Sequence, residues 1–214
     1  MDIIYLGHSS FRLKGKSTSL VTDPFDKDML GLKYPNIEAD IVTISHDHQD
    51  HNVTSAVENV HKVVDGPGEY EILGVSIIGL STFHDDKKGE LRGKNTIYVI
   101  EIDGLRIAHL GDLGHKLTES KLSDIGTIDI LMIPVGGIYT IEPTIAANIT
   151  RGIEPSVTIP MHYFNPDLNE ETFGKLAKVE TFLSEVGLTV ERMKKLSVKS
   201  GNLSEEKKVV VLEI

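Results

Sequence analysis

The sequence contains no cysteine among its 214 residues. This absence excludes disulfide bonds and thiolate ligands, so any metal would have to be bound by His, Asp or Glu side chains. No apolar run approaches the ~20 residues that a membrane-spanning helix requires. Residues 1–5 contain an acid and lack the basic segment, followed by an apolar one, that is typical of a secretion signal. We therefore expect a cytoplasmic protein with no membrane partner.

Basic residues are also scarce. The chain has 22 Lys and Arg against 32 Asp and Glu, which gives a formal net charge of −10. A protein that binds long nucleic acid usually needs a basic surface to replace phosphate counterions. We interpret the one local concentration of lysines as a solvated face, formed by Lys194, Lys195, Lys199, Lys207 and Lys208. Nucleic acid is therefore a disfavoured partner. We expect a small-molecule substrate, and a homo-oligomer stays open.

The remaining composition is that of an ordinary globular protein, with 40% apolar and 25% charged residues. No linker rich in Pro, Gly or Ser interrupts the chain, so we expect residues 1–214 to form a single domain. The apolar run at 41–44 predicts a strand buried on both faces. Residues 96–110 predict a hairpin that turns at Asp103-Gly104, and residues 170–186 predict an amphipathic helix. Strands come first and then alternate with helices, which favours two layers of sheet covered by helices.

Three histidines and two acids are concentrated at residues 46–51, directly after the strand predicted at 41–44. His46 and His48 point to the same side if the backbone stays extended. Asp50 and His51 follow where the chain must turn, so they can approach the same volume from a second direction. Imidazole nitrogen and carboxylate oxygen are the usual ligands of zinc and related ions. The pattern H-x-H-x-D-H therefore predicts a metal site.

Three more candidate ligands follow predicted strands elsewhere in the chain, namely His84, Asp112 and His162. Each stands at a junction between a strand and a loop, where the active-site residues of layered folds gather. Gly111 and Gly114 flank Asp112 and suit a backbone that passes close to an ion. A catalytic metal site needs several protein ligands and an open position. These three residues would complete the set that begins at 46–51.

The chain resembles the metallo-β-lactamase fold superfamily over nearly its whole length. The resemblance rests on the candidate ligands above, on Asp23 and on the run Pro-Met-His-Tyr at 160–163. Within the superfamily, the chain looks most like the branch of the ascorbate-6-phosphate lactonase and its relatives. That likeness rests on Gly-His-Ser-Ser-Phe at 7–11, Asp-Pro at 23–24, Gly-Pro-Gly-Glu-Tyr-Glu at 66–71 and Pro-Val-Gly-Gly at 134–137. The resemblance implies an α/β fold, a four-layer αββα sandwich of two mixed β-sheets flanked by helices.

The resemblance also implies two divalent metal ions at one edge of the sandwich. Carried over residue by residue, the first ion would be bound by His46, His48 and His84. The second would be bound by Asp50, His51 and His162, and Asp112 would bridge the two ions. Asp23 would lie behind these ligands and order the histidine loop.

The chain departs from the superfamily pattern in two ways. It has no cysteine to serve as a ligand of the second metal, as in the commonest class of β-lactamases, which argues against an antibiotic-degrading role. It is also shorter than the lactonase, so that elements shaping a sugar-phosphate pocket are expected to be missing. The resemblance therefore implies a fold and a metal site but names no substrate.

Two divalent ions that share one water can lower its pKa from about 16 towards 7, which makes a hydroxide nucleophile. As the catalytic residues we expect Asp112, which would set the spacing of the ions, and Asp50, which would also accept a hydrogen bond from the nucleophile. The predicted activity is metal-dependent hydrolysis of an ester-like bond, a lactone or a phosphodiester, in a small anionic molecule. Zinc is the first expectation for both ions, although manganese and iron suit the same ligands.

Four further residues are candidates for substrate binding or for support of the ligands. His8 lies in a turn near the N-terminus, where substrate contact and a structural hydrogen bond are both open. Tyr139 follows Gly136-Gly137, while Tyr163 and Asn165 follow His162. Core packing is the competing interpretation for both tyrosines. His109 we expect to be a buried structural histidine, and His61 to lie on the surface.

Two other functions stay open from the sequence. One is a nuclease or tRNA-processing enzyme on the same scaffold, which would need a basic surface for RNA. The other is a metal-binding protein without catalysis. The presence of all seven expected ligands argues against a loss of activity.

Overall fold

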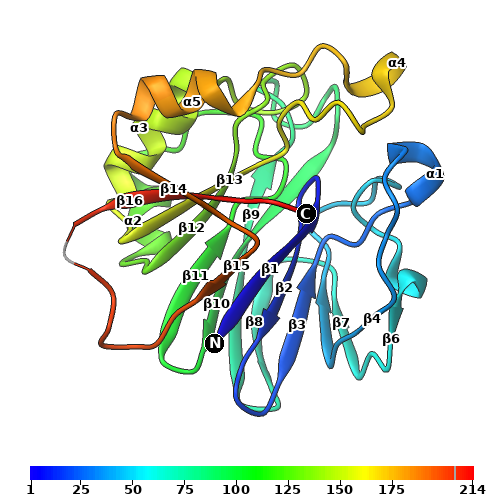
Figure 1. Ribbon diagram of the computed structural model, residues 1–214, viewed down its shortest axis with the longest axis vertical. Helices are drawn as coiled ribbons and strands as arrows, with labels where there is room; N and C mark the ends of the chain where they lie inside the picture. Colours follow the sequence, from blue (N-terminus) through cyan, green and yellow to red (C-terminus); the bar gives the residue numbers. More distant parts are fainter. Residues whose placement is uncertain (205) are drawn as a thin grey trace.

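The computed structural model describes residues 1–204 and 206–214, and two stacked β-sheets make up its centre (Figure 1). The first sheet has six strands and is built mainly from the N-terminal part of the chain. In spatial order the strands are β15 (Lys195–Ser197), β1 (Asp2–Gly7), β2 (Ser10–Lys14), β3 (Ser19–Thr22), β5 (Ile41–Thr43) and β7 (Lys62–Val64). Strands β3, β5 and β7 are parallel to one another, so their carboxyl ends meet at one edge.

The second sheet has eight strands. In spatial order they are β14 (Thr189–Met193), β16 (Lys208–Leu212), β13 (Val157–Met161), β12 (Ile130–Pro134), β11 (Leu105–His109), β10 (Lys94–Ile102), β9 (Val75–Phe83) and β8 (Gly68–Ile72). The predicted hairpin is confirmed: β10 and β11 are antiparallel, and both turn residues, Asp103 and Gly104, have positive φ. Strands β11, β12 and β13 are parallel, so their carboxyl ends also share an edge.

The main core lies between the two sheets. It contains alternate apolar side chains of both, for example Ile3, Phe11 and Ile41 from the first sheet and Ile77 and Tyr98 from the second. Such residues come from short runs that are apolar on both faces, because each sheet is covered on its outer side as well. Hydrogen bonds join the sheets at the edge where the histidine run begins: the Tyr98 hydroxyl donates to Ile44 O at 2.8 Å, for example, and Thr96 N–H donates to Ser45 O at 2.8 Å.

The outer faces of the two sheets are covered differently. Over the eight-stranded sheet lie α2 (Glu119–Ile125), α3 (Pro143–Ile153) and α5 (Val179–Val186), as Figure 1 shows. The six-stranded sheet is covered by the short ribbon of β4 (Ile37–Glu38) and β6 (Val57–Glu58), with the 3₁₀ turn η1 (Thr54–Ala56) and α1 (Lys27–Leu30) beside it. The predicted sandwich of two mixed sheets is confirmed, and its layer over the six-stranded sheet contains little helix.

The prediction of one helix over residues 170–186 is wrong. The segment forms two short helices, α4 (Glu170–Phe173) and α5, separated by a turn that begins at Gly174. In the turn, Ala177 N–H donates to Gly136 O at 2.8 Å, and Ala177 O accepts the N–H of Phe164 at 2.9 Å. Phe173 consequently packs in a small cluster with α1 instead of following Phe182 into the helix layer. Among the described residues no helix is both long and apolar enough to cross a membrane.

Candidate metal centre

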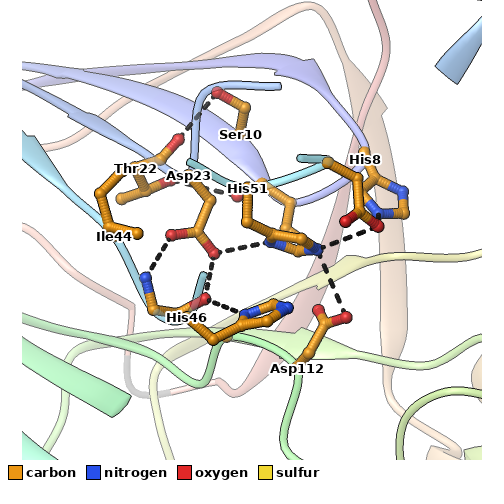
Figure 2. Close-up of polar contacts among 12 residues, drawn as sticks. His8, Ser10, Thr22, Asp23, Ile44, His46, His51 and Asp112 are labelled. Atoms are coloured by element: carbon orange, nitrogen blue, oxygen red, sulfur yellow. Dashed lines mark hydrogen bonds and ion pairs between the residues drawn. The ribbon is translucent and has the colours of Figure 1, made fainter. Parts of the chain in front are cut away.

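The histidine run that follows β5 folds around a buried carboxylate, that of Asp23 (Figure 2). Asp23 directly follows β3, and its Oδ1 accepts the N–H of Ser45 at 2.8 Å. Its Oδ2 accepts the Ser45 hydroxyl at 2.6 Å and Nδ1–H of His51 at 2.9 Å. Burial, the largest single influence, raises the pKa of Asp23, but the hydrogen bond with His51 and the charges of the neighbouring histidines together lower it. Asp23 is therefore an ionised acceptor that orders this loop.

These hydrogen bonds decide which nitrogen of each imidazole faces the cluster. Ser45 has one hydroxyl hydrogen, and it is donated to Asp23. Ser45 Oγ, 2.9 Å from His46 Nδ1, can therefore only accept, which places a proton on Nδ1 of His46. Nδ1 of His51 is occupied by Asp23 in the same way. Both rings consequently present Nε2 to the interior of the site.

A first group of potential ligands consists of three imidazoles, His46, His48 and His84. Their ring centroids lie 4.6 Å apart for His46 and His48, 4.6 Å for His46 and His84, and 5.3 Å for His48 and His84. His84 follows β9 and is fixed by its N–H, which donates to Gly93 O at 3.0 Å. One nitrogen of each ring lies within 4.8 Å of the others. This spacing lets a single ion contact all three.

A second group consists of His8, Asp50, His51 and His162. Asp50 Oδ2 lies 3.5 Å from His51 Nε2 and 3.3 Å from His8 Nε2. His8 is buried in a left-handed turn between β1 and β2, with φ 56°, and its carbonyl accepts the N–H of His162 at 2.8 Å. The expected trio of Asp50, His51 and His162 thus comes together, and His8 touches Asp50 directly.

Asp112 lies between the two groups. Its Oδ2 is 3.3 Å from His51 Nε2, 3.3 Å from His84 Nε2 and 3.1 Å from His162 Nε2. The Asp112 N–H donates to Asn95 Oδ1 at 2.9 Å. Gly111 makes this approach feasible, because a Cβ there would stand 2.4 Å from Asn95 Oδ1. Asp112 therefore contacts one histidine of the first group and two of the second.

Several buried polar atoms of the cluster have no hydrogen-bond partner among the described residues. They include Nε2 of His46, His51 and His162 and Oδ1 of Asp112. Leaving such atoms unsatisfied would cost about 1–3 kcal/mol each. Nitrogen lone pairs and carboxylate oxygens are the donor atoms that zinc, manganese and iron accept. The residues present therefore fit bound metal ions.

The charges of the site also favour a cation. Burial raises the pKa of Asp112, but the charges of His162 and His51 lower it well below the usual value. Burial lowers the pKa of His51, yet the carboxylates of Asp112 and Asp50 raise it well above its usual value. Burial and the charge of His51 lower the pKa of His46. The metal-free chain thus keeps Asp112 ionised and favours the protonated form of His51, where a metal ion would supply the positive charge.

A cavity of about 440 Å³ opens onto the cluster. His48, His84, Asp50, Asp112 and His162 form part of its wall. The other lining residues are Met29, Asp47, Gln49, Arg92, Tyr139, Thr172 and Phe173. Tyr139, expected as a substrate contact, is therefore placed at the cavity, and its hydroxyl donates to Thr172 O at 2.9 Å.

Two expected substrate contacts lie elsewhere. Tyr163 and Asn165 line a separate cavity beside β16 and the C-terminal residues, and neither lines the cavity at the metal cluster. The reason is local: His162 has φ 51°, which turns the chain away from the site immediately after the ligand. Tyr163 packs against the helix layer, and Asn165 Oδ1 accepts the N–H of Asp167 at 2.9 Å. Both residues therefore lie outside the cavity at the metal cluster.

His109 and His61 lie as expected. His109 is fully buried, its Nε2 lies 2.9 Å from Ser9 O, and its Nδ1 accepts the N–H of Gly111 at 3.2 Å. Both nitrogens are thus occupied by the backbone. His61 is exposed on the surface.

Arg92 and Phe173 are among the residues of the cavity wall that sequence reasoning missed. Arg92 comes eight positions after His84, in a polar loop with glycines at 89 and 93 that could have signalled a turn back to the site. Phe173 was assigned to a continuous helix, although Gly174 marks the break. Asn95, which accepts the Asp112 N–H, gave no sequence signal at all.

Comparison with known proteins agrees with this geometry. The family model described as Beta-lactamase superfamily domain matches residues 2–162. The chain belongs to this family. A 2.00 Å crystal structure of a Thermotoga maritima protein, provisionally described as a zinc-dependent hydrolase of the metallo-β-lactamase superfamily, superposes with a TM-score of 0.83. It is 38% identical, over 99% of this chain and 98% of that one.

Relatives known by sequence point the same way. A UPF0173 metal-dependent hydrolase of Thermococcus onnurineus is 30% identical over 191 residues, which cover 76% of this chain and 84% of that protein. Its counterpart in Thermoplasma acidophilum is 30% identical over 206 residues, covering 83% and 91%. The expected membership of the metallo-β-lactamase superfamily is thus confirmed, and the expectation of a metal-dependent hydrolase agrees with the names of these relatives.

Proposed function

We propose that the chain hydrolyses an ester-like bond, a lactone or a phosphodiester, in a small anionic molecule, and that it does so with two divalent metal ions. The supporting observation is the position of Asp112. Its Oδ2 lies within 3.3 Å of one histidine from the first group and two from the second, while its Oδ1 is buried without a partner among the described residues. An acid placed in this way suits a bridge between two ions.

In this proposal His46, His48 and His84 bind one ion, and Asp50, His51 and His162 bind the other. The ions, when bound, would supply a water whose pKa falls from about 16 towards 7. Asp112 fixes the spacing of the two groups. Asp50 lines the cavity, so its carboxylate is available to accept a hydrogen bond from the nucleophile. His8 contacts Asp50 Oδ2 and restrains the direction of that carboxylate.

Zinc is the metal we favour for both positions. The donor set of imidazoles and carboxylates suits zinc, manganese and iron alike. The similar Thermotoga maritima protein carries the description of a zinc-dependent hydrolase. Zinc accordingly comes first, with manganese and iron as alternatives.

A small substrate is favoured over a polymer. The cavity of about 440 Å³ lies in the range that pockets for small molecules occupy. The net charge of −10 disfavours a long polyanion. The lactone option rests on the motifs shared with the ascorbate-6-phosphate lactonase branch, and the phosphodiester option on the chemistry that paired metal ions support.

The test is metal analysis combined with a panel of chromogenic lactones and phosphodiesters, using the wild type and His48→Ala. His48 is exposed and lines the cavity, so its loss should abolish turnover and reduce metal content without unfolding the protein. His61→Ala is the matched control, because this exposed histidine belongs to neither group of candidate ligands. A wild type that takes up no zinc or manganese and is inert throughout contradicts the proposal. Metal uptake without turnover would favour a non-catalytic protein, and salt-sensitive RNA cleavage would favour a nuclease.

A further inference from the structure

Arg92 is the one permanently cationic side chain among the described residues that line the cavity of the metal cluster. Three acids, Asp47, Asp50 and Asp112, line the same cavity. Arg92 is half-buried, yet it forms no salt bridge with any acid of residues 1–204 and 206–214. A cation held beside a metal site without a carboxylate partner suggests that its counterion comes from outside the chain.

The loop that carries Arg92 is held by a single buried carboxylate. Asp85 directly follows the candidate ligand His84, and its two oxygens accept four backbone N–H groups of the loop. Oδ1 accepts from Lys87 at 2.8 Å and Gly89 at 2.9 Å, and Oδ2 from Leu91 at 2.9 Å and Arg92 at 2.8 Å. Burial raises the pKa of Asp85, but these N–H groups, that of Arg92 first, lower it to about 2. The carboxylate is thus ionised at neutral pH and fixes the backbone of Arg92.

A second loop positions the guanidinium itself. Ile138 has φ 58°, a conformation that is rare for a β-branched residue and costs of order 1–3 kcal/mol. The Ile138 carbonyl accepts one hydrogen bond from Arg92 Nη2 at 3.1 Å. The ring of Tyr139, the next residue, lies 5.7 Å from the guanidinium carbon, within the range of a cation–π contact. The strained residue Ile138 and its neighbour Tyr139 thus both contact the guanidinium of Arg92.

Most of the hydrogen-bonding capacity of Arg92 is unused. A guanidinium carries five N–H donors in a planar fork that matches carboxylate and phosphate oxygens. Within the described residues, the bond to Ile138 is the only side-chain hydrogen bond that Arg92 donates. Arg92 would also lie near the two metal ions of the proposed function. Three neighbouring positive charges are unfavourable unless an anion joins them. An oxyanion on the substrate would accept the free N–H groups of Arg92 and would also balance the positive charge.

We propose that Arg92 binds an oxyanion group, a carboxylate or a phosphate, on a part of the substrate that is not cleaved. This inference rests on the proposed hydrolysis and narrows its substrate to esters or lactones that carry such a group. Arg92 is then a specificity-determining residue. Asp85 acts only through it, as a positioning residue.

The test compares two esters that differ in one carboxylate, 4-nitrophenyl butyrate and mono-(4-nitrophenyl) glutarate, with the zinc-loaded protein. Wild type should prefer the glutarate ester. Arg92→Gln should reduce kcat/KM for the glutarate ester roughly tenfold to hundredfold more than for the butyrate ester, mainly through KM, because a hydrogen-bonded charge pair is lost. Arg92→Lys should restore only part of the preference, since a lysine lacks the planar fork.

Lys87→Gln is the matched control. It removes the same charge from the same loop at an exposed position outside the cavity, and it should leave the preference unchanged. If Arg92→Gln and Lys87→Gln lose the preference for the glutarate ester equally, the effect comes from the overall charge of the protein and the proposal is wrong. An unchanged preference in Arg92→Gln would overturn it as well.

A binding measurement separates this inference from the proposed activity. Glutarate and inorganic phosphate are titrated calorimetrically into zinc-loaded wild type and Arg92→Gln. Weaker binding of one anion in the variant supports the role of Arg92 and identifies the group as carboxylate or phosphate. If wild type cleaves neither ester, the proposed hydrolysis of such esters fails, and the titration alone decides: equal affinity of both proteins for both anions contradicts the inference.

Discussion

At the scale of single residues, the site depends on side chains that occupy one nitrogen of a histidine and leave the other free. Asp23 and Ser45 together do this for two imidazoles. Asp23 Oδ2 accepts Nδ1–H of His51, and Ser45 Oγ accepts Nδ1–H of His46. Such outer partners fix the ring orientation and raise the basicity of the nitrogen that faces the metal. The candidate ligands are therefore aligned before any ion arrives.

We predict that Asp23→Asn lowers zinc affinity about 10- to 100-fold. The NH2 group of asparagine is a donor and would face the donors of Ser45 or His51. The hydrogen bond that orients the His51 ring would then be lost or weakened. Unsatisfied buried groups should also destabilise the metal-free fold by about 1–3 kcal/mol. Zinc affinity is measured by competition with a chelating dye. Asp124→Asn is the control, because within the described part of the chain this exposed acid is paired only with Lys121. Wild-type affinity in Asp23→Asn would contradict this account of the loop.

At the scale of elements, the strand ends are brought together by close backbone contacts. Gly136, in the loop after β12, lies directly against the backbone of His162, which follows β13. A Cβ at Gly136 would stand 2.1 Å from the His162 carbonyl oxygen, a distance that no side-chain adjustment can relieve. The same loop accepts the Ala177 N–H at Gly136 O and so also anchors the turn that places Phe173 at the cavity.

Gly136→Ala should therefore destabilise the protein by about 1–3 kcal/mol or more, because the added methyl group meets backbone. Thermal or chemical unfolding of the metal-free protein measures the change. Gly66→Ala adds the same group where nothing lies within 4 Å, and it should be nearly neutral. Similar stabilities for the two variants would show that the loop yields easily and that this contact does not position His162.

At the scale of the whole molecule, the sequence allowed the sandwich and the candidate ligands to be predicted, because their signals are local. The run at 46–51 is contiguous, and His84, Asp112 and His162 each follow an apolar strand. Residues positioned by tertiary contacts could not be found in this way. Arg92 is held at the cavity because four backbone N–H groups of its loop, its own included, donate to Asp85. Tyr163 lies away from the cavity because of the φ of His162. The break in the helix at Gly174 likewise depends on hydrogen bonds to distant loops.

The central claim is that two metal ions are bound on either side of Asp112. The most direct measurement is anomalous diffraction at the zinc edge from crystals of the zinc-loaded protein. The account predicts two peaks, one among His46, His48 and His84 and the other among Asp50, His51 and His162, with the Asp112 carboxylate between them. A single peak, no peak, or zinc bound away from Asp112 would contradict it.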